Sequence, residues 1–123
     1  MPTIRFGRMQ HQIMQVLWSR QRASARDITD ALNKEEAVAH STVQTLLRKL
    51  EAKGAVGHDV EERTFVFFPL VGEQKAVRSA TRELVERVFG GSFAGLMAHL
   101  LANEKIPPHE LKQIRKLIDE KKP

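Results

Sequence analysis

The 123-residue sequence contains no cysteine. Disulfides, zinc sites with thiolate ligands, iron–sulfur clusters and thiol nucleophiles are therefore excluded. Its longest apolar runs are four or five residues, far short of the roughly 20 that span a bilayer, so no membrane partner is expected. No apolar stretch of signal-peptide length follows the first residues, which predicts a cytoplasmic protein. The sequence also lacks low-complexity runs, internal repeats and Gly/Ser-rich linkers.

Charge divides the chain into three segments. The formal net charge is +5 and the pI is near 9.9. Residues 1–53 carry a net +4, residues 54–71 a net −2, and residues 72–123 a net +3. A basic balance suggests an anionic partner, although a net charge of +5 alone is a weak indication.

The first half of the chain shows helical periodicity. A helix is predicted over 8–20, where Met9, Ile13, Val16 and Leu17 fall on one face. A second helix is predicted to begin at Ser24, which can cap free N–H groups, and to end near Asn33. A third begins at His40 or Ser41 and stops at Gly54, a good C-terminal signal after a basic residue.

The period then changes to that of strands. Residues 55–59 and 64–69 predict an antiparallel hairpin whose turn lies in 60–63. Three helices followed by a hairpin indicate a winged helix-turn-helix, in which the hairpin is the wing. This arrangement is most often a DNA-binding module. The fold class is thus mainly α with a small β-hairpin, and the DNA-binding domain is expected at residues 1–71.

Residues 72–123 are predicted to be helical throughout, with helices after Glu73, after Ser92 and from Pro107-Pro108. A segment of this size is small for an independent core, so pairing with a second copy of the chain is favoured. The predicted dimerisation residues lie on apolar stripes: Val77, Leu84, Val88, Phe93, Leu96, Met97, Leu100, Leu111, Ile114 and Leu117. Small-molecule binding by these stripes is a less favoured alternative.

The third helix carries a polar face that suits base edges. Projection at 100° per residue places its apolar residues on one side and Ser41, Thr42, Gln44, Thr45 and Arg48 on the other. Glutamine pairs with adenine, arginine with guanine, and threonine contacts the thymine methyl. We therefore predict that these five residues read bases in the major groove. The predicted phosphate contacts surround them: Arg5, Arg8, Arg22, Arg26, Lys49, Lys53 and Arg63.

Motifs along nearly the whole chain carry a family resemblance. The segment Val-Gln-Thr-Leu-Leu-Arg-Lys-Leu-Glu-Ala-Lys-Gly at 43–54 is preceded by 13–18 and followed by 64–71. Residues 87–92 and 110–114 also fit the pattern. In these segments the chain resembles the penicillinase-repressor family, which includes repressors of β-lactamase, methicillin-resistance and copper-homeostasis operons. The resemblance implies a homodimer that binds a palindromic operator, with intertwined C-terminal helices.

The chain departs from that family in places that concern its signal. Copper-responsive members carry C-terminal Cys-x-Cys pairs, whereas this chain has no cysteine. β-Lactam-responsive members are cleaved at an Asn-Phe bond, where this chain has His99-Leu100; a sensor protease is a partner that the resemblance alone suggests. The wing is acidic, with Asp59, Glu61 and Glu62, where relatives often have basic residues, so fewer wing contacts to phosphate are expected.

Other functions have weaker support. No nucleophile, base and orienting group converge in the sequence, so an enzyme is not expected. A metal site at His58, Asp59, Glu61 and Glu62 is disfavoured because strand geometry spreads these residues over two faces, and neither a metal nor another cofactor is predicted. The alternative to a repressor is a winged-helix module that binds protein rather than DNA. Salt dependence separates the two, because binding through several phosphates weakens steeply with salt.

Overall fold

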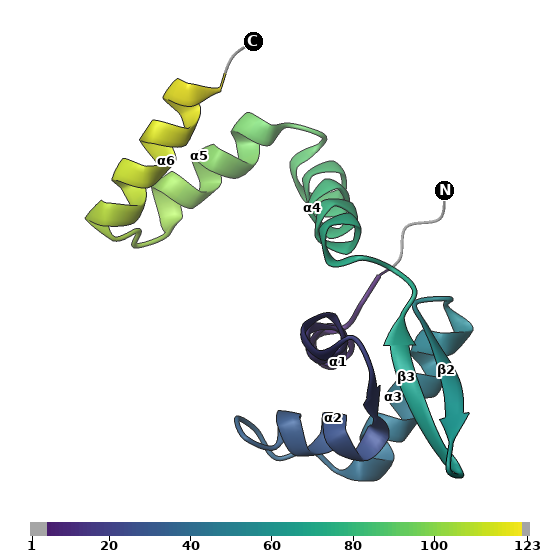
Figure 1. The fold of residues 1–123 in the computed structure, drawn as a ribbon. Helices are drawn as coiled ribbons and strands as arrows, with labels where there is room; N and C mark the ends of the chain where they lie inside the picture. Colours follow the sequence, from purple (N-terminus) through teal and green to yellow (C-terminus); the bar gives the residue numbers. More distant parts are fainter. Residues whose placement is uncertain (1–4, 122–123) are drawn as a thin grey trace. The chain divides into compact units, whose positions relative to one another are not determined.

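The computed structural model describes residues 5–121. The chain forms two compact units, Met1–Glu83 and Leu84–Pro123, and helix α4 (Glu73–Phe89) contributes to both. Figure 1 shows the elements in chain order. The expected domain boundary at 71/72 lies ahead of α4, whereas the compact units divide within that helix. No helix in the described range is long and apolar enough to cross a membrane.

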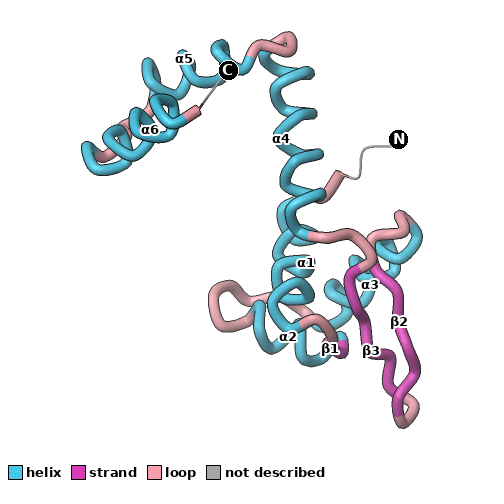
Figure 2. Tube along the Cα trace, turned by 45° about the horizontal axis from the view of Figure 1, so that its top comes forward, coloured by secondary structure: helices cyan, strands magenta, loops and turns pink. Residues whose placement is uncertain are grey.

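The first unit is built from three helices and a small antiparallel sheet. Helices α1 (Arg8–Arg20), α2 (Ala25–Leu32) and α3 (His40–Ala52) precede strands β2 (Val56–Glu61) and β3 (Thr64–Pro69), and the short strand β1 (Ala23–Ser24) lies between α1 and α2. The strand order is β1-β3-β2. Figure 2 shows the β2–β3 turn projecting beyond the helices. These elements confirm the winged helix-turn-helix.

One apolar core joins the helices to the sheet. Its largest fully buried side chains come from α1, α2, α3 and β2, and Phe67 of β3 closes it from the sheet side at 6% exposure. The fully buried members are Ile13, Met14, Leu17, Ile28, Val43, Leu47, Leu50 and Val56. Because α1, α2 and α3 each bury one stripe in the same core, the opposite faces are left to solvent.

Local signals explain the helix ends. Ser24 Oγ accepts a hydrogen bond from Asp27 N at 3.1 Å, and Asp27 Oδ2 accepts one from Ser24 N at 3.2 Å. This reciprocal capping box fixes the start of α2 as predicted. Asn33 ends α2, and its side chain bonds both Val38 N and Val38 O at 3.0 Å. The loop before α3 is thus held to the end of α2, and Gly54 follows α3 at φ +80°.

The wing differs from the prediction in two respects. Strand β2 continues to Glu61, so the turn is only Glu62-Arg63, with φ of +50° and +67°. Two central residues at positive φ belong to the tight hairpin turn that suits twisted strands, but the usual Asn-Gly signal is missing here. The sequence also gave no sign of β1, which pairs Ala23 with Phe67 and Ser24 with Val66. A strand of two residues is too short to show a period.

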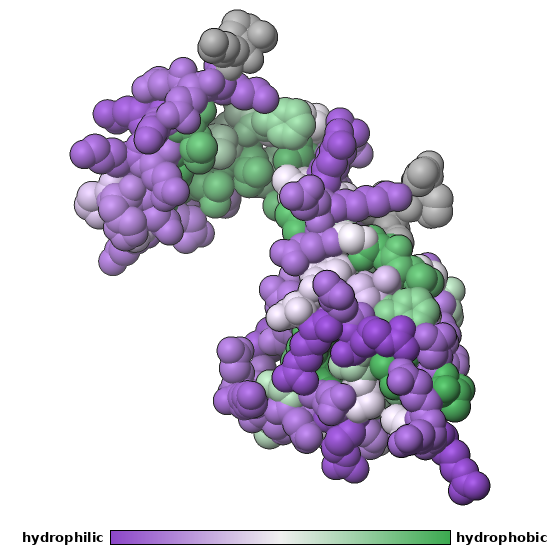
Figure 3. All heavy atoms as spheres, viewed as in Figure 1, coloured by the Kyte–Doolittle hydropathy of each residue, from purple (hydrophilic) through white to green (hydrophobic). Residues whose placement is uncertain are grey.

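The second unit consists of the end of α4 with helices α5 (Phe93–Asn103) and α6 (Pro108–Glu120). Gly90 and Gly91, at φ +58° and +85°, terminate α4, and Ser92 Oγ caps α5 by accepting from Gly95 N at 2.8 Å. Neither α5 nor α6 contains a buried residue. Figure 3 shows apolar side chains gathered over α5, with hydrophilic side chains over α6. This unit therefore leaves much of its apolar surface uncovered.

Candidate nucleic-acid interface

Helix α3 has one buried and one exposed face. Val43, Leu47 and Leu50 are 0% exposed and anchor the helix in the core. All five predicted base-reading residues are exposed: Ser41, Thr42, Gln44, Thr45 and Arg48. Thr45 Oγ1 donates to Ser41 O at 3.0 Å, one turn earlier in the helix. The structure thus brings these five residues together on the solvent side of one helix.

A pocket of about 450 Å³ lies between α3, the start of α2 and the wing. We name it the α3–wing pocket; it is lined by Ser24, Ala25, Arg26, His40, Gln44, Arg48, Arg63, Thr64, Phe65 and Phe67. Three of these residues are arginines and none is acidic. Arg26, Arg48 and Arg63 have no carboxylate partner among the residues of the described range. The pocket therefore presents cations whose charge is free to meet an anion.

Several predicted phosphate contacts have other partners in the structure. Arg5 forms an ion pair with Glu83, which raises the pKa of Arg5 chiefly through the hydrogen bond from its guanidinium to that carboxylate. Arg8 Nη2 lies 3.0 Å from Glu36 Oε2. Lys53 Nζ donates to the backbone carbonyl of Arg5 at 2.7 Å. These three cations are not brought to the α3–wing pocket.

Arg22 is the fourth predicted phosphate contact that is already paired. Its Nη2 donates to Asp59 Oδ2 at 2.9 Å and to Glu61 Oε2 at 2.8 Å. The hydrogen bonds to Glu61 and then Asp59 raise the pKa of Arg22 above its usual range. Its guanidinium carbon also lies 5.7 Å from the centroid of Phe68. Of the seven candidates, Arg26, Lys49 and Arg63 have neither an ion pair nor a side-chain hydrogen bond among the residues described, whereas Lys53 is hydrogen-bonded to Arg5 O and Gln10 Oε1.

The inner face of the wing packs against α3. His58 Nδ1 lies 2.7 Å from Glu51 Oε2, and the His58 ring stacks on Phe65 with centroids 4.1 Å apart. Asp59 and Glu61, at the alternate positions of the strand, lie on the opposite face. The described residues contain no group of three or more histidine and acidic side chains arranged to hold a metal ion.

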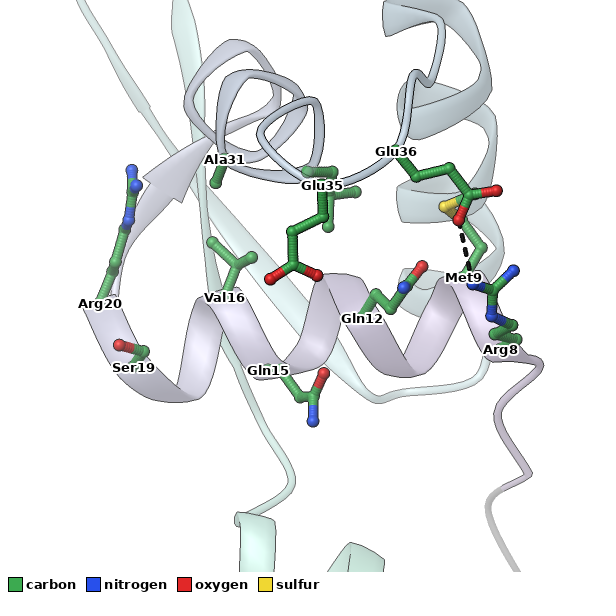
Figure 4. A pocket seen from close by; sticks show the side chains of 11 residues that line it. Arg8, Met9, Gln12, Gln15, Val16, Ser19, Arg20, Ala31, Glu35 and Glu36 are labelled. Carbon is green, nitrogen blue, oxygen red and sulfur yellow. Dashed lines mark hydrogen bonds and ion pairs between the residues drawn. The ribbon is translucent and has the colours of Figure 1, made fainter.

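A second pocket, of about 510 Å³, lies between α1 and the end of α2 (Figure 4). Glu35 extends over α1 beside Gln12 and Val16, and the Arg8–Glu36 ion pair closes one end. Arginines and glutamates line it together. Because it carries charges of both signs, this pocket does not present the uncompensated positive charge of the α3–wing pocket.

The sequence missed the aromatic wall of the α3–wing pocket. Phe65 is 50% exposed and Phe67 is 6% exposed, and both face α3 from β3. Their spacing of two residues was the available signal, because alternate residues of a strand share a face. The contribution of Ser24 and Ala25 could not be anticipated without knowing that β1 joins the sheet beside β3.

Comparison with known proteins identifies the family. Residues 6–120 match the family model described as "Penicillinase repressor". The chain belongs to the penicillinase repressor family. This family consists of transcriptional repressors rather than enzymes, in agreement with the absence of a catalytic constellation from the sequence.

Characterised members are similar over most of their length. The penicillinase repressor of Bacillus licheniformis is 24% identical over 111 residues, which are 90% of this chain and 87% of that protein. The methicillin resistance regulatory protein MecI of Staphylococcus aureus strain N315 is 22% identical over 89% of each chain. The solution structure of the monomeric form of B. licheniformis BlaI in complex with the blaP half-operator is similar at a TM-score of 0.52 and 27% identity. That match covers 60% of this chain and 90% of the BlaI chain.

Proposed function

We propose that this protein is a transcriptional repressor that binds an operator in double-stranded DNA through α3. The observation that carries the proposal is the exposed polar face of α3 beside a pocket whose three arginines have no carboxylate partner within residues 5–121. A basic, acid-free cleft next to polar side chains at a helix start is what a duplex requires, because phosphates position the protein and base edges are read beside them. The similarity to BlaI, determined with a half-operator, supports the same use of the fold.

Each predicted base-reading residue of α3 has a chemical role in this proposal. Arg48 pairs with O6 and N7 of guanine, Gln44 pairs with adenine, and the methyl groups of Thr42 and Thr45 contact thymine. Ser41 lies in the first turn, where its small side chain lets the helix approach the groove closely. The unpaired cations beside the helix, Arg26, Lys49 and Arg63, bind backbone phosphates. Since DNA is the partner, we place the protein in the cytoplasm.

The second unit supports a homodimer. Several of its predicted dimerisation residues remain exposed in a single chain, with Phe93 at 65%, Leu117 at 62% and Val88 at 57%. Leu96, Met97, Leu100 and Ile114 are partly buried. Large side chains left in water on several helices are typical of an unpaired interface. A two-fold dimer would present two α3 helices to the two halves of a palindromic operator.

Selection of duplexes from a random pool, followed by binding measurements on the enriched sequence, tests the DNA-reading proposal. Gln44→Ala and Arg48→Ala should each weaken binding by about 5- to 150-fold, because one good base contact is worth about 1–3 kcal/mol. Each variant should also relax the preference at one base pair only. Arg20→Ala is the matched control, since Arg20 is an exposed arginine at the end of α1, outside the pocket. A pool with no enriched sequence would favour the protein-binding alternative.

The homodimer is tested by Leu117→Asp. Burying an exposed leucine contributes about 1.5–3 kcal/mol, and each substitution occurs twice in a two-fold dimer. The dimer dissociation constant should therefore rise by about 10²- to 10⁴-fold. Gln113→Asp, on the same exposed helix, is the control. Sedimentation velocity measures both, and an unchanged dimer in Leu117→Asp would place the interface elsewhere.

A further inference from the structure

Two of the three acidic residues of the wing, Asp59 and Glu61, are hydrogen-bonded to the same cation, Arg22. Arg22 donates through one nitrogen, Nη2, to carboxylates on two alternate residues of β2, Asp59 and Glu61. The two acids share a face because their positions differ by two in the strand. Glu62, the third acid of the wing, lies in the turn and has no such partner among the described residues.

The side chain of Arg22 crosses the sheet and so links strands at its two edges. Arg22 directly precedes β1, an edge strand of only two residues that pairs with β3 at Phe67 and Val66. The side chain passes over β3, where its guanidinium lies 5.7 Å from the Phe68 ring, and ends on β2. Arg22 thus connects the body of the unit to the distal half of the wing, which the two residues of β1 cannot reach.

Phe68 completes the outer face of the sheet beneath this arginine. It lies opposite Gly57, and a Cβ on Gly57 would come within 2.9 Å of the Phe68 ring. The ring therefore lies directly across the glycine, with the guanidinium near it. Asp59 and Glu61 also lie on this face, and Arg22 offsets part of their negative charge.

We propose that Arg22, Asp59 and Glu61 form a clamp that positions the wing beside α3, and that Arg22 is a positioning residue rather than a phosphate contact. The part of this proposal that concerns DNA rests on the proposed function. The clamp holds the outer face, while His58 and Glu51 hold the inner face against α3. Between them the wing keeps Arg63, in its turn, at the rim of the α3–wing pocket. Asp59 and Glu61 therefore support DNA binding indirectly, although their charge alone would oppose it.

The first test measures the wing in the free, full-length protein. Hydrogen exchange of the β2 and β3 amides is compared in Arg22→Gln, in Asp59→Asn/Glu61→Gln and in the control Glu62→Gln. Losing an exposed ion-pair network should make the amides next to the turn exchange about fivefold faster in the first two variants. Glu62→Gln removes one negative charge from the same hairpin without breaking an ion pair among the described residues, and should leave exchange unchanged. Equal exchange in all three variants overturns the clamp without any reference to DNA.

The second test measures the affinity of each variant for the selected operator and predicts whether it falls or rises. Asp59→Asn/Glu61→Gln and Arg22→Gln should each weaken binding about fivefold. The variant with all three substitutions should bind no more weakly than either, because each of the three variants removes the same interaction. Arg22→Gln should leave the slope of log Kd against log salt unchanged, since no phosphate contact is lost. If removal of the two acids instead tightens binding, or if Arg22→Gln reduces the slope by about 0.9, Arg22 is a phosphate contact and the proposal fails. Failure of the wild-type protein to bind any duplex would refute the proposed function instead.

Discussion

The division of the cations into paired and unpaired side chains leads to a quantitative prediction about salt. Arg26, Lys49 and Arg63 have no carboxylate partner in the part of the chain described, whereas Arg8 lies 3.0 Å from Glu36. If the unpaired cations bind phosphates, each releases counterions when the complex forms. Replacing each by glutamine should therefore change the salt dependence of DNA binding, and replacing Arg8 should not.

The magnitude follows from the number of contacts. Each phosphate contact contributes about 0.9 to the slope of log K against log salt. Between 50 and 200 mM salt, one contact accounts for about a 3.5-fold loss of affinity, and three contacts for about 40-fold. The triple variant Arg26→Gln/Lys49→Gln/Arg63→Gln should thus bind with a slope smaller by about 2.7 than that of the wild-type protein. Preference among duplexes should stay the same, because phosphates carry no sequence information directly.

Fluorescence anisotropy of a labelled duplex at several salt concentrations measures this slope. Arg8→Gln is the matched control, because it removes the same side chain from an exposed position of the same unit. The reasoning is refuted if Arg8→Gln lowers the slope as much as Arg63→Gln does. In that case exposed ion pairs would exchange freely for phosphate, and pairing within the protein would say nothing about the interface.

Two further predictions concern stability. Gly57→Ala should lower the free energy of unfolding by about 1–3 kcal/mol, because its Cβ would displace the Phe68 ring. Gly72→Ala is the control, because a Cβ there meets no atom within 4 Å and should not lower the free energy of unfolding. Chemical denaturation measures both variants. Leu47→Ala should cost about 2–5 kcal/mol because Leu47 is 0% exposed, while Thr45→Ala, on the opposite face of α3, should keep the fold in the same assay and weaken only DNA binding.

Most of the fold was predictable because its signals are local. The ends of α1 and α2, the capping box at Ser24 and the stop near Asn33 depend on residues within one or two turns of each other. The tight turn of the wing was not predictable in the same way. Glu62 and Arg63 adopt positive φ without glycine or asparagine, and the pairing of β2 with β3 imposes that geometry.

The residue types of the site could be predicted from the sequence, but which of its cations form ion pairs could not. The polar face of α3 follows from helical periodicity, and the five residues predicted to read bases are all exposed. Which arginines are free does not follow, because the partners are distant in the sequence. Arg5 pairs with Glu83, and Arg22 pairs with Asp59 and Glu61. No periodicity relates such positions, so a basic residue near a DNA-binding helix indicates a candidate contact only.

The acidic wing shows why formal charge is a poor guide to an interface. Residues 54–71 carry a net −2, which taken alone suggests repulsion from phosphate. In the folded unit Asp59 and Glu61 lie on the face opposite His58 and are both hydrogen-bonded to Arg22, which comes from outside that segment. At the α3–wing pocket the same hairpin presents Arg63 and two phenylalanines and no carboxylate. DNA that approached the α3–wing pocket would therefore meet the inner face of the hairpin, whereas Asp59 and Glu61 lie on its outer face beside Arg22.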